Sequence, residues 1–256
     1  MPVTSERVRT EGWGVALIGP SRARTQDQLL CRNDLGLFVV AEGVSRQLGG
    51  DQASRLAVDT MARCVSAAHA SQAGARATPD APSTGLQLLR RAIVEANRTV
   101  HDAARAMRLQ GGMGTTLTAL YFAGRIAYVG HLGNARAYAL REDTVRLLTR
   151  NHSDLDDETP SRDRDRIGDE TRPNVLPGCL GFRPHVQPIM SRVPVLPGDR
   201  FLLCSAGVWS IVPEADMAAL RRAACSFVPH LLVQLARDGG GTADAICVAV
   251  ETSPVA

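Results

Sequence analysis

The sequence predicts an α+β fold in a single domain. Short β-rich runs separated by polar turns fill the start of the chain, two segments with helical periodicity follow between residues 51 and 109, and strand-like runs then resume. No internal repeat and no Pro-rich linker divides the 256 residues, so one domain is expected over 1–256, with its core at about 12–251. A chain of this length is long enough to bury a large core.

The composition excludes several classes of protein. Apolar residues make up 45% and charged residues 21% of the chain, which excludes wholesale disorder. No apolar run reaches the roughly 20 residues of a membrane span, and the start of the chain lacks the apolar core of a secretory signal. We therefore expect a cytoplasmic protein without a membrane partner. A net charge of +3 is too small to indicate nucleic acid, and 6 scattered cysteines favour free thiols.

The first half of the chain is expected to hold three strands and then a helix. The strands are expected at 13–18, 28–32 and 36–41, and the last is apolar throughout, which is typical of a strand buried on both faces. Apolar side chains then recur at helical spacing over 51–69. Residues 70–85 are small and polar and contain Pro and Gly, which predicts a loop.

A second helix is expected to run to about residue 109. Its apolar side chains alternate steps of three and four, which predicts a core-facing stripe made of Leu86, Leu89, Ile93, Ala96, Val100, Ala103 and Met107. Ser83 or Thr84 is the candidate N-cap, and the Gly111-Gly112 pair ends the helix.

The second half of the chain reads as strands, a polar loop and a helical segment before the last strand. Four runs at 115–122, 126–132, 135–140 and 144–149 predict an antiparallel meander, because the turns between them are short. Residues 150–173 contain almost no apolar side chain and predict a flap-like solvated loop. The remaining elements are expected at 186–193 (strand), 200–204 (strand), 214–222 (helix), 227–237 (helix capped by Ser226) and 245–250 (strand).

Six short strings, collinear over residues 12–251, resemble those of one family. They are GLFVVAEGVSRQLGGDQAS, GMGTTLTAL, AYVGHLGNARAYAL, RPNVLPGCLG, PGDRFLLCSAG and GGTADAICVAV. They are similar to strings of the metal-dependent protein phosphatases of bacterial type, also called PPM or type 2C serine/threonine phosphatases. The resemblance implies a four-layer αββα sandwich of two antiparallel sheets flanked by helix pairs, with the active site at one edge between the sheets.

The resemblance also implies two divalent cations, Mn²⁺ or Mg²⁺, held by carboxylates. In the family these ions activate a water that attacks phosphoserine or phosphothreonine. Hard cations prefer oxygen ligands, and two of them close together need anionic ligands to offset their repulsion. The run RARTQDQ, which begins at Arg22, sits where a bacterial member of the family carries RxxNED. The matching positions imply Asp27, Glu42, Asp244 and the carbonyl of Gly43 as metal ligands. Arg22 falls where the family grips phosphate, although it is alternatively one of many surface arginines.

Several site positions depart from the family pattern. Gln26 replaces a glutamate, Asn134 replaces the aspartate tied to a third metal, and Ala206 replaces an aspartate that binds the first metal. Glu42 stands for an aspartate, and its additional methylene moves the carboxylate by roughly 1.5 Å. Arg46 adds a bulky cation nearby. Three of six acidic positions are thus kept, too few to neutralise two dications and a phosphate as the full set would.

Three hypotheses follow. The first is a pseudophosphatase that keeps the fold, binds metal weakly, at one site or not at all, and acts by binding a phosphoprotein or a signalling kinase. The second is an active or weakly active Mn²⁺- or Mg²⁺-dependent phosphatase, in which Glu42 and Asp244 hold a metal and an acid of the polar loop, Asp154, Asp156 or Asp157, replaces the missing ligand. The third is an unrelated α+β domain with chance matches.

Overall fold

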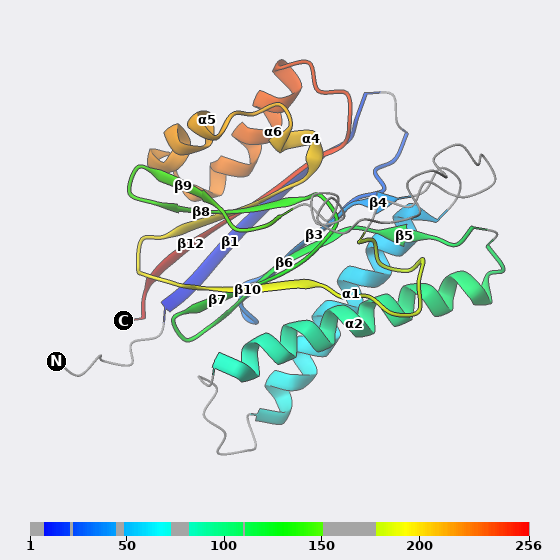
Figure 1. Cartoon of the computed structure of the whole chain (residues 1–256). Coiled ribbons are helices and arrows are strands. Elements are labelled where there is room, and N and C mark those ends of the chain that lie inside the picture. Colours follow the sequence, from blue (N-terminus) through cyan, green and yellow to red (C-terminus); the bar gives the residue numbers. More distant parts are fainter. Residues whose placement is uncertain are drawn as a thin grey trace, which may run out of the picture.

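The chain forms a four-layer sandwich of helices and two antiparallel sheets (Figure 1). The computed structural model describes residues 8–20, 23–44, 49–72, 82–109, 111–150 and 178–255. In these ranges the two five-stranded sheets face each other, and helices cover the outer face of each sheet. The predicted α+β class and the αββα arrangement are confirmed.

Each large sheet combines strands that are far apart in the sequence. Sheet A contains, in spatial order, β1 (Val8–Leu17), β12 (Ala245–Pro254), β11 (Arg200–Cys204), β8 (Arg136–Arg141) and β9 (Thr144–Leu147). Sheet B contains β10 (Ile189–Pro194), β7 (Ile126–Leu132), β6 (Leu117–Ala123), β3 (Leu37–Ala41) and β2 (Gln28–Arg32). A two-stranded sheet is formed by β4 (Gly43–Val44) and β5 (Gly114–Thr115).

The helices form the two outer layers. Sheet B is covered by α1 (Gly50–Gln72) and α2 (Pro82–Ala106). Sheet A is covered by α4 (Ala206–Trp209), α5 (Glu214–Ala219), η2 (Leu220–Arg222), η3 (Cys225–Phe227) and α6 (Val228–Asp238). The apolar stripes of α1 and α2 face sheet B, as the helical periodicity predicts.

Three apolar layers hold the sandwich together, one between the sheets and one under the helices that cover each sheet. Between the sheets, Phe122 makes edge contacts with Phe38 and Phe201, with ring centroids 5.8 Å and 5.1 Å apart. Every residue of β3 is buried, because its side chains alternate between this layer and the layer under the helices. The continuous apolar run of β3 therefore correctly predicts a strand that is buried on both faces.

The predicted meander is wrong at its centre. The pairs β6–β7 and β8–β9 are antiparallel hairpins, but β7 belongs to sheet B and β8 to sheet A. The chain crosses between the sheets at 133–135, where Gly133 has φ 110°. A short turn signal shows that the chain reverses, but it does not show that the next strand stays in the same sheet, so the sequence alone could not reveal this crossing.

The helix boundaries also differ from expectation. Residues 70–72 and 82–85 are helical, while 73–81 lie outside the described residues. Ser83 and Thr84 therefore lie inside α2 and do not cap it, since Pro82 opens the helix, a position where its missing N–H costs nothing. Met107 follows the last residue of α2 and is 47% exposed, so it is not part of the core stripe.

Near the C-terminal end, the short helix α4 was not foreseen, and the expected cap Ser226 lies within η3 while Phe227 precedes α6. Of the predicted loop at 150–173, Arg150 alone lies within the described residues. No helix in the described ranges is long and apolar enough to cross a membrane. The cysteines in the same ranges are free thiols. The single domain remains a prediction.

Candidate functional site

Four segments of the chain meet at one edge of the sandwich. They are the loop before β2, the residue after β3, the start of α4 after β11, and the residue before β12. The small sheet of β4 and β5 marks this edge in Figure 1. These segments, together with Gly43, which follows Glu42, bring together six of the positions that the resemblance implies: Gln26, Asp27, Glu42, Gly43, Ala206 and Asp244.

Asp244 joins the loop before β2 to the start of β12. Its Oδ1 accepts a hydrogen bond from the backbone N–H of Gly19 at 2.7 Å. Its Oδ2 accepts one from the hydroxyl of Thr25 at 3.1 Å and one from the backbone N–H of Gln26 at 3.4 Å. Asp244 is only 4% exposed, so these donors replace the water that its carboxylate loses on folding. Both oxygens are therefore engaged by the protein itself.

Gln26 and Asp27 lie in the loop before β2, and hydrogen bonds to the backbone of this loop hold it in place. The backbone N–H of Asp27, itself buried, donates to the hydroxyl of Thr25 at 3.0 Å. The carbonyl of Gln26 accepts the hydroxyl of Ser54 at 2.6 Å and the N–H of Gly43 at 3.2 Å. The hydroxyls of Thr25 and Ser54 thus fix the loop. The sequence analysis did not identify either residue, because an isolated Ser or Thr forms no recognisable pattern.

Gly43 lies where the backbone of three segments converges. A Cβ at this position would lie 2.5 Å from the carbonyl oxygens of Gln26 and Gly50, so no larger residue fits without a shift of the backbone. The side-chain Oε1 of Gln26 lies 3.0 Å from the place that a Cβ on Gly50 would occupy. Gly43 therefore preserves a close backbone approach, while Gln26 supplies a neutral amide where the family has a carboxylate.

Glu42 is fixed through its backbone by the two threonines at the junction of β5 and β6. Its N–H donates to the hydroxyl of Thr116 at 3.1 Å, and its carbonyl accepts the N–H of Thr116 at 2.9 Å. The hydroxyl of Thr115 donates to the same carbonyl at 2.9 Å. Both threonines belong to the GMGTTLTAL string, so their place in that string was the signal that could have identified them.

The Glu42 carboxyl group connects the two sheets. Glu42 follows β3 of sheet B, and its Oε2 accepts the backbone N–H of Ala206, which lies just after β11 of sheet A, at 3.2 Å. Its Oε1 is buried and has no hydrogen-bond partner in the part of the chain that the structure describes. The carboxyl group thus bonds to the backbone of the residue whose side chain would be a carboxylate in the family.

Burial raises the pKa of Glu42 from its ordinary value of 4.5 to about 8, and the negative charges of Asp27 and Asp244 add to this rise. The hydrogen bond from Ala206 acts in the opposite direction, because it favours the ionised form. At neutral pH, in the absence of a bound cation, Glu42 is therefore mainly protonated. The three acids of the site do not together carry three negative charges.

We expect the free energy of unfolding to fall as the pH rises from about 5 to 8, because of Glu42. In this window the folded protein keeps a proton that the unfolded chain has released, so each pH unit favours unfolding by up to about 1.4 kcal/mol. Glu42→Gln cannot ionise, and we expect it to remove this slope and to be the more stable protein at pH 8. Urea unfolding at several pH values measures the effect. Glu11→Gln, at an exposed residue of β1, should unfold like the wild type; equal slopes in both variants would contradict the assignment.

Ala206 opens α4 at a point held tightly against β12. The preceding Ser205 is fully buried, its N–H donates to the carbonyl of Ile246 at 2.9 Å, and its hydroxyl accepts the N–H of Ile246 at 2.8 Å. A Cβ on Gly207 would overlap the carbonyl oxygen of Asp244, so α4 lies directly on the Asp244 backbone. Ala206 is therefore held beside Asp244 and Glu42, and its methyl side chain has no ligand atom to offer.

The other predicted positions are not joined to this cluster. Asn134 is half-buried in the crossing between β7 and β8, and no hydrogen bond connects it to the site within the described residues. Its neighbour Gly133 lies against Thr116, since a Cβ there would be 2.6 Å from the Thr116 side chain. Arg22, Arg46 and the acids of the polar loop lie outside the described residues, so their predicted roles stay predictions.

The described residues do not fit a pair of divalent cations. Among them, no group of three or more His, Cys, Asp or Glu side chains is arranged to hold a metal ion. The oxygens of Asp244 accept hydrogen bonds from the protein, Glu42 bonds to Ala206, and Ala206 has no side-chain oxygen. A two-metal centre needs several anionic oxygens directed at the same point.

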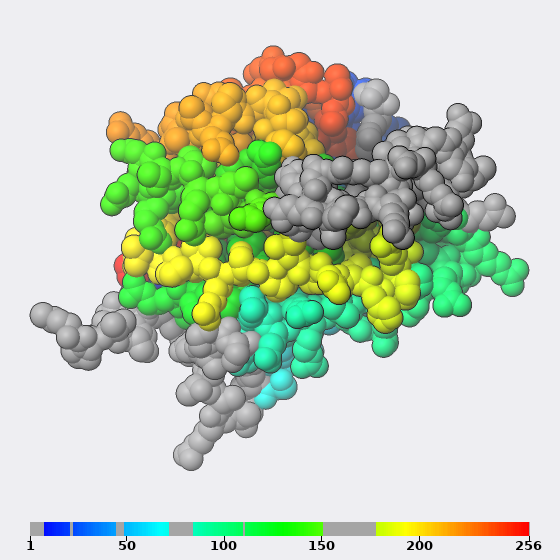
Figure 2. Space-filling model, in the orientation of Figure 1, coloured from blue at the N-terminus to red at the C-terminus, as the bar shows by residue number. Residues whose placement is uncertain are grey.

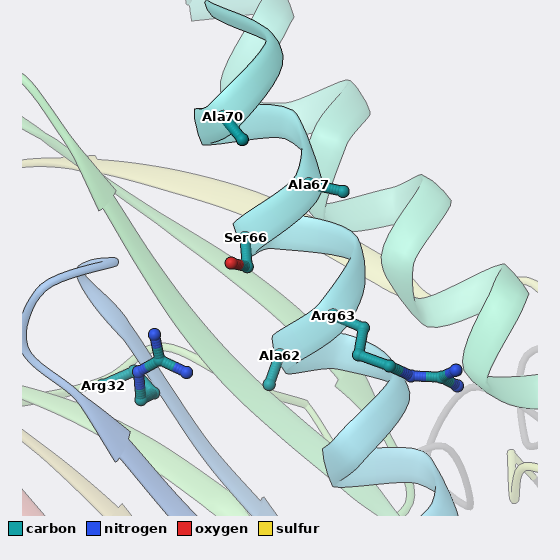
Figure 3. A pocket seen from close by; sticks show the side chains of 6 residues that line it. All are labelled: Arg32, Ala62, Arg63, Ser66, Ala67 and Ala70. Carbon is teal, nitrogen blue, oxygen red and sulfur yellow. The ribbon is translucent and has the colours of Figure 1, made fainter. Parts of the chain in front are cut away.

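A surface hollow of about 370 Å³ lies elsewhere, between β2 and α1 (Figure 3). It is lined by Arg32, Ala62, Arg63, Ser66, Ala67 and Ala70. The guanidinium of Arg32 is paired with Asp34 at 2.6 Å, and that of Arg63 donates to the hydroxyl of Thr60 at 3.0 Å. The hollow contains none of the candidate site residues and takes no part in the site.

The family of the chain follows from comparison with known proteins. A family model described as protein phosphatase 2C matches residues 21–239, which is more than half of the chain. The chain therefore belongs to the protein phosphatase 2C family, a family of metal-dependent serine/threonine phosphatases. The resemblance read from the six strings is confirmed.

Individual relatives agree with this assignment. The serine/threonine phosphatase Stp of Listeria innocua is 32% identical over 183 residues, which are 71% of this chain and 69% of that protein. PstP of Mycobacterium tuberculosis is 28% identical over 228 residues, and the match covers 87% of this chain but 41% of PstP. Among solved structures, the catalytic domain of PstP with 2 manganese ions has a TM-score of 0.77 at 25% identity, and PppA of Pseudomonas aeruginosa has 0.76 at 25%. Each match covers 96% of this chain and 99% of the other.

Proposed function

We propose that this chain is a protein phosphatase 2C-like pseudophosphatase, whose two-metal chemistry is impaired and which acts by binding a protein. The observation that carries the proposal is the hydrogen bond from the N–H of Ala206 to the carboxyl group of Glu42. One oxygen of Glu42 is engaged by the backbone of position 206, and the side chain at position 206 supplies no carboxylate for a cation. Gln26 supports the same conclusion, because it places a neutral amide where a third carboxylate belongs.

The site is consistent with folding in the absence of cations. Three carboxylates left unneutralised in a buried site would repel one another strongly, and metal ions remove that repulsion in an active member of the family. Here the raised pKa of Glu42 lessens the repulsion by protonation, and the donors to Asp244 lessen it by hydrogen bonding. Such a site does not need a cation to be stable.

The partner we propose is a phosphoprotein or a signalling kinase in the bacterial cytoplasm. The relatives are named serine/threonine phosphatases, and a phosphatase of this kind must bind phosphorylated serine or threonine residues. A domain that keeps this fold but hydrolyses the phosphate ester slowly would hold a phosphoprotein instead of dephosphorylating and releasing it.

A second candidate function, a phosphatase with a rearranged metal site, is favoured by one observation. Glu42 Oε1 is buried without a hydrogen-bond partner among the described residues, and Asp27 and Asp244 are near enough to raise the pKa of Glu42. A single Mn²⁺ or Mg²⁺ at this point would displace the proton of Glu42 and use its vacant oxygen. Any further ligand would have to come from another part of the chain.

Turnover of an aryl phosphate and of a phosphothreonine peptide with Mn²⁺ separates the two functions. For the pseudophosphatase we expect a rate at least about 100-fold below that of the PstP catalytic domain under the same conditions, since the cost of losing first-shell ligands should exceed the range known for second-shell changes. Titration calorimetry should show weak or no Mn²⁺ binding. Turnover comparable to PstP that requires Mn²⁺ and is lost in Asp27→Asn and Glu42→Gln would contradict the proposal and support the rearranged site.

A further inference from the structure

One side of α2 is strongly basic. The helix and the two residues after it carry two acids, Glu95 and Asp102, and five exposed arginines: Arg90, Arg91, Arg98, Arg105 and Arg108. The four arginines inside α2 lie within an arc of about 100° around its axis, and the two acids, which are seven residues apart, lie beyond one border of this arc. Arg98 pairs with Glu95 across that border at 3.6 Å, and both side chains are exposed. Exposed pairs of this kind are weak, so the arginines remain available to an anionic partner.

The segment that lies against this side of α2 adds arginines and no acid. Residues 178–194 contain exposed Arg183 and Arg192 and neither Asp nor Glu. Asn97 of α2 connects the two, because its amide donates to the carbonyl of Arg183 at 3.0 Å and its Oδ1 accepts the N–H of Gly181 at 2.8 Å. In Figure 2 the yellow atoms of this segment and the blue-green atoms of α2 lie side by side on one face.

Arg192 lies on the same side of sheet B as α2. It belongs to the edge strand β10, and Met190, two residues earlier, packs in the apolar layer under α1 and α2. Side chains two residues apart in a strand are on the same face. Together with the five arginines of α2 and its end, Arg183 and Arg192 form a surface that we call the arginine face.

The arginine face reaches the candidate site through the chain itself. Leu180 and Thr115 exchange backbone hydrogen bonds at 2.8 Å and 3.2 Å, and the hydroxyl of Thr115 donates to the carbonyl of Glu42 at 2.9 Å. Three residues after Leu180, the chain reaches Arg183 beside α2. A polypeptide bound at the candidate site can therefore continue along residues 180–183 onto the arginine face.

We propose that the arginine face binds an acidic stretch of the phosphoprotein whose phosphorylated residue lies in the candidate site. The inference rests on the proposed function for the kind of partner, and it adds the sequence that the partner carries next to its phosphorylated residue. Guanidinium groups bind carboxylates through paired hydrogen bonds, so a row of arginines suits a row of Asp and Glu. The arginines of α2 extend over about 23 Å, which corresponds to about seven residues of an extended peptide.

The continuity with the candidate site is what favours a protein segment as the occupant. Nucleic acid and an anionic membrane would also be attracted by exposed arginines, but neither needs the surface to begin where a phosphorylated side chain would lie. An acidic stretch on the same polypeptide gains from both contacts at once, since the second contact is made at a high effective concentration.

Fluorescence anisotropy with labelled phosphothreonine peptides tests the proposal, in EDTA so that no ester is hydrolysed. The acidic peptide has Asp and Glu over about seven residues on each side of the phosphothreonine, and the neutral peptide has Asn and Gln at the same places. We expect the full chain to bind the acidic peptide at least about 10-fold more tightly at low salt. The difference should shrink as the salt concentration rises, because salt screens exposed charges.

A charge reversal with a matched control locates the effect. Arg98→Glu with Arg105→Glu should remove most of the preference for the acidic peptide and leave the affinity for the neutral peptide unchanged. Both side chains are exposed, and Arg98→Gln with Arg105→Gln is a second variant that adds no acid to the helix and should lose part of the preference. Arg9→Glu with Arg146→Glu, at exposed residues of β1 and β9 in sheet A, changes the net charge equally and should behave like the wild type.

Three results would each overturn the inference: equal affinity for the two peptides, an equal loss of preference in the sheet A control, or duplex DNA bound as tightly as the acidic peptide and weakened by the same charge reversal. None of them decides the proposed function, which depends on turnover with Mn²⁺. A chain that hydrolyses phosphothreonine as fast as PstP and still prefers the acidic peptide would refute the pseudophosphatase and keep the arginine face as a substrate-binding surface.

Discussion

The triple variant Ala206→Asp, Glu42→Asp, Gln26→Glu is expected to bind Mn²⁺ at least about 100-fold more tightly than the wild type and to hydrolyse a phosphothreonine peptide measurably faster. The substitutions restore two carboxylates and shorten a third. The shorter side chain at position 42 reaches less far toward the backbone N–H of residue 206, so its oxygens become free for a cation. Titration calorimetry and turnover with Mn²⁺ measure the two effects.

The matched control replaces Ala206 by Asn in the same triple background. Asparagine has nearly the shape of aspartate but no negative charge, so the comparison separates the effect of the negative charge from the effect of side-chain volume. We expect the control to fold like the triple variant and to gain little affinity for Mn²⁺. A folded triple variant that binds Mn²⁺ no better than the wild type would show that the loss of acids is not what weakens the site.

Asp244→Ala is expected to lower the free energy of unfolding by about 2–4 kcal/mol, because it leaves buried donors without an acceptor. The backbone N–H of Gly19 and the hydroxyl of Thr25 lose a charged partner, and the loop before β2 loses its connection to β12. The loss of Asp244 also removes a charge that raises the pKa of Glu42, which offsets part of the cost. Urea unfolding at pH 7 measures the net effect.

Two comparisons make this prediction specific. Asp238→Ala removes an exposed carboxylate with one side-chain partner, and we expect it to change stability by less than about 0.5 kcal/mol. Asp244→Asn keeps an acceptor oxygen for the Gly19 N–H and should cost less than Asp244→Ala. If Asp244→Ala and Asp238→Ala unfold at the same urea concentration, Asp244 does not hold the loop in place.

The sequence predicted those features that depend on local pattern. The apolar run of β3 predicted burial correctly, and the alternating steps in α2 did so up to Ala103, because a strand buried on both faces and an amphipathic helix leave different periods in the sequence. The strings of the family then placed Asp27, Glu42, Ala206 and Asp244 in one site, which the structure brings together.

Features that depend on long-range contacts were not predictable in this way. The crossing from β7 to β8 looks like any short turn in sequence, and the bond between Glu42 and Ala206 joins residues 164 positions apart. Its donor is a backbone N–H, which every residue except proline has, so residue type gave no signal. The anchoring hydroxyls of Thr25 and Ser54 were missed for a similar reason, since their partners lie in other segments.

The pairing of β1 with β12 has a consequence for how the protein folds during synthesis. β1 is an edge strand of sheet A, its neighbour is β12, and the bond from Gly19 to Asp244 spans 225 positions. The ribosome therefore releases the first strand long before its partner exists, and the unpaired strand edge is open to association with other nascent chains. Loop closure over such a span is entropically expensive, so we infer that sheet A is completed late and slowly, after sheet B and its helices have already formed a compact half.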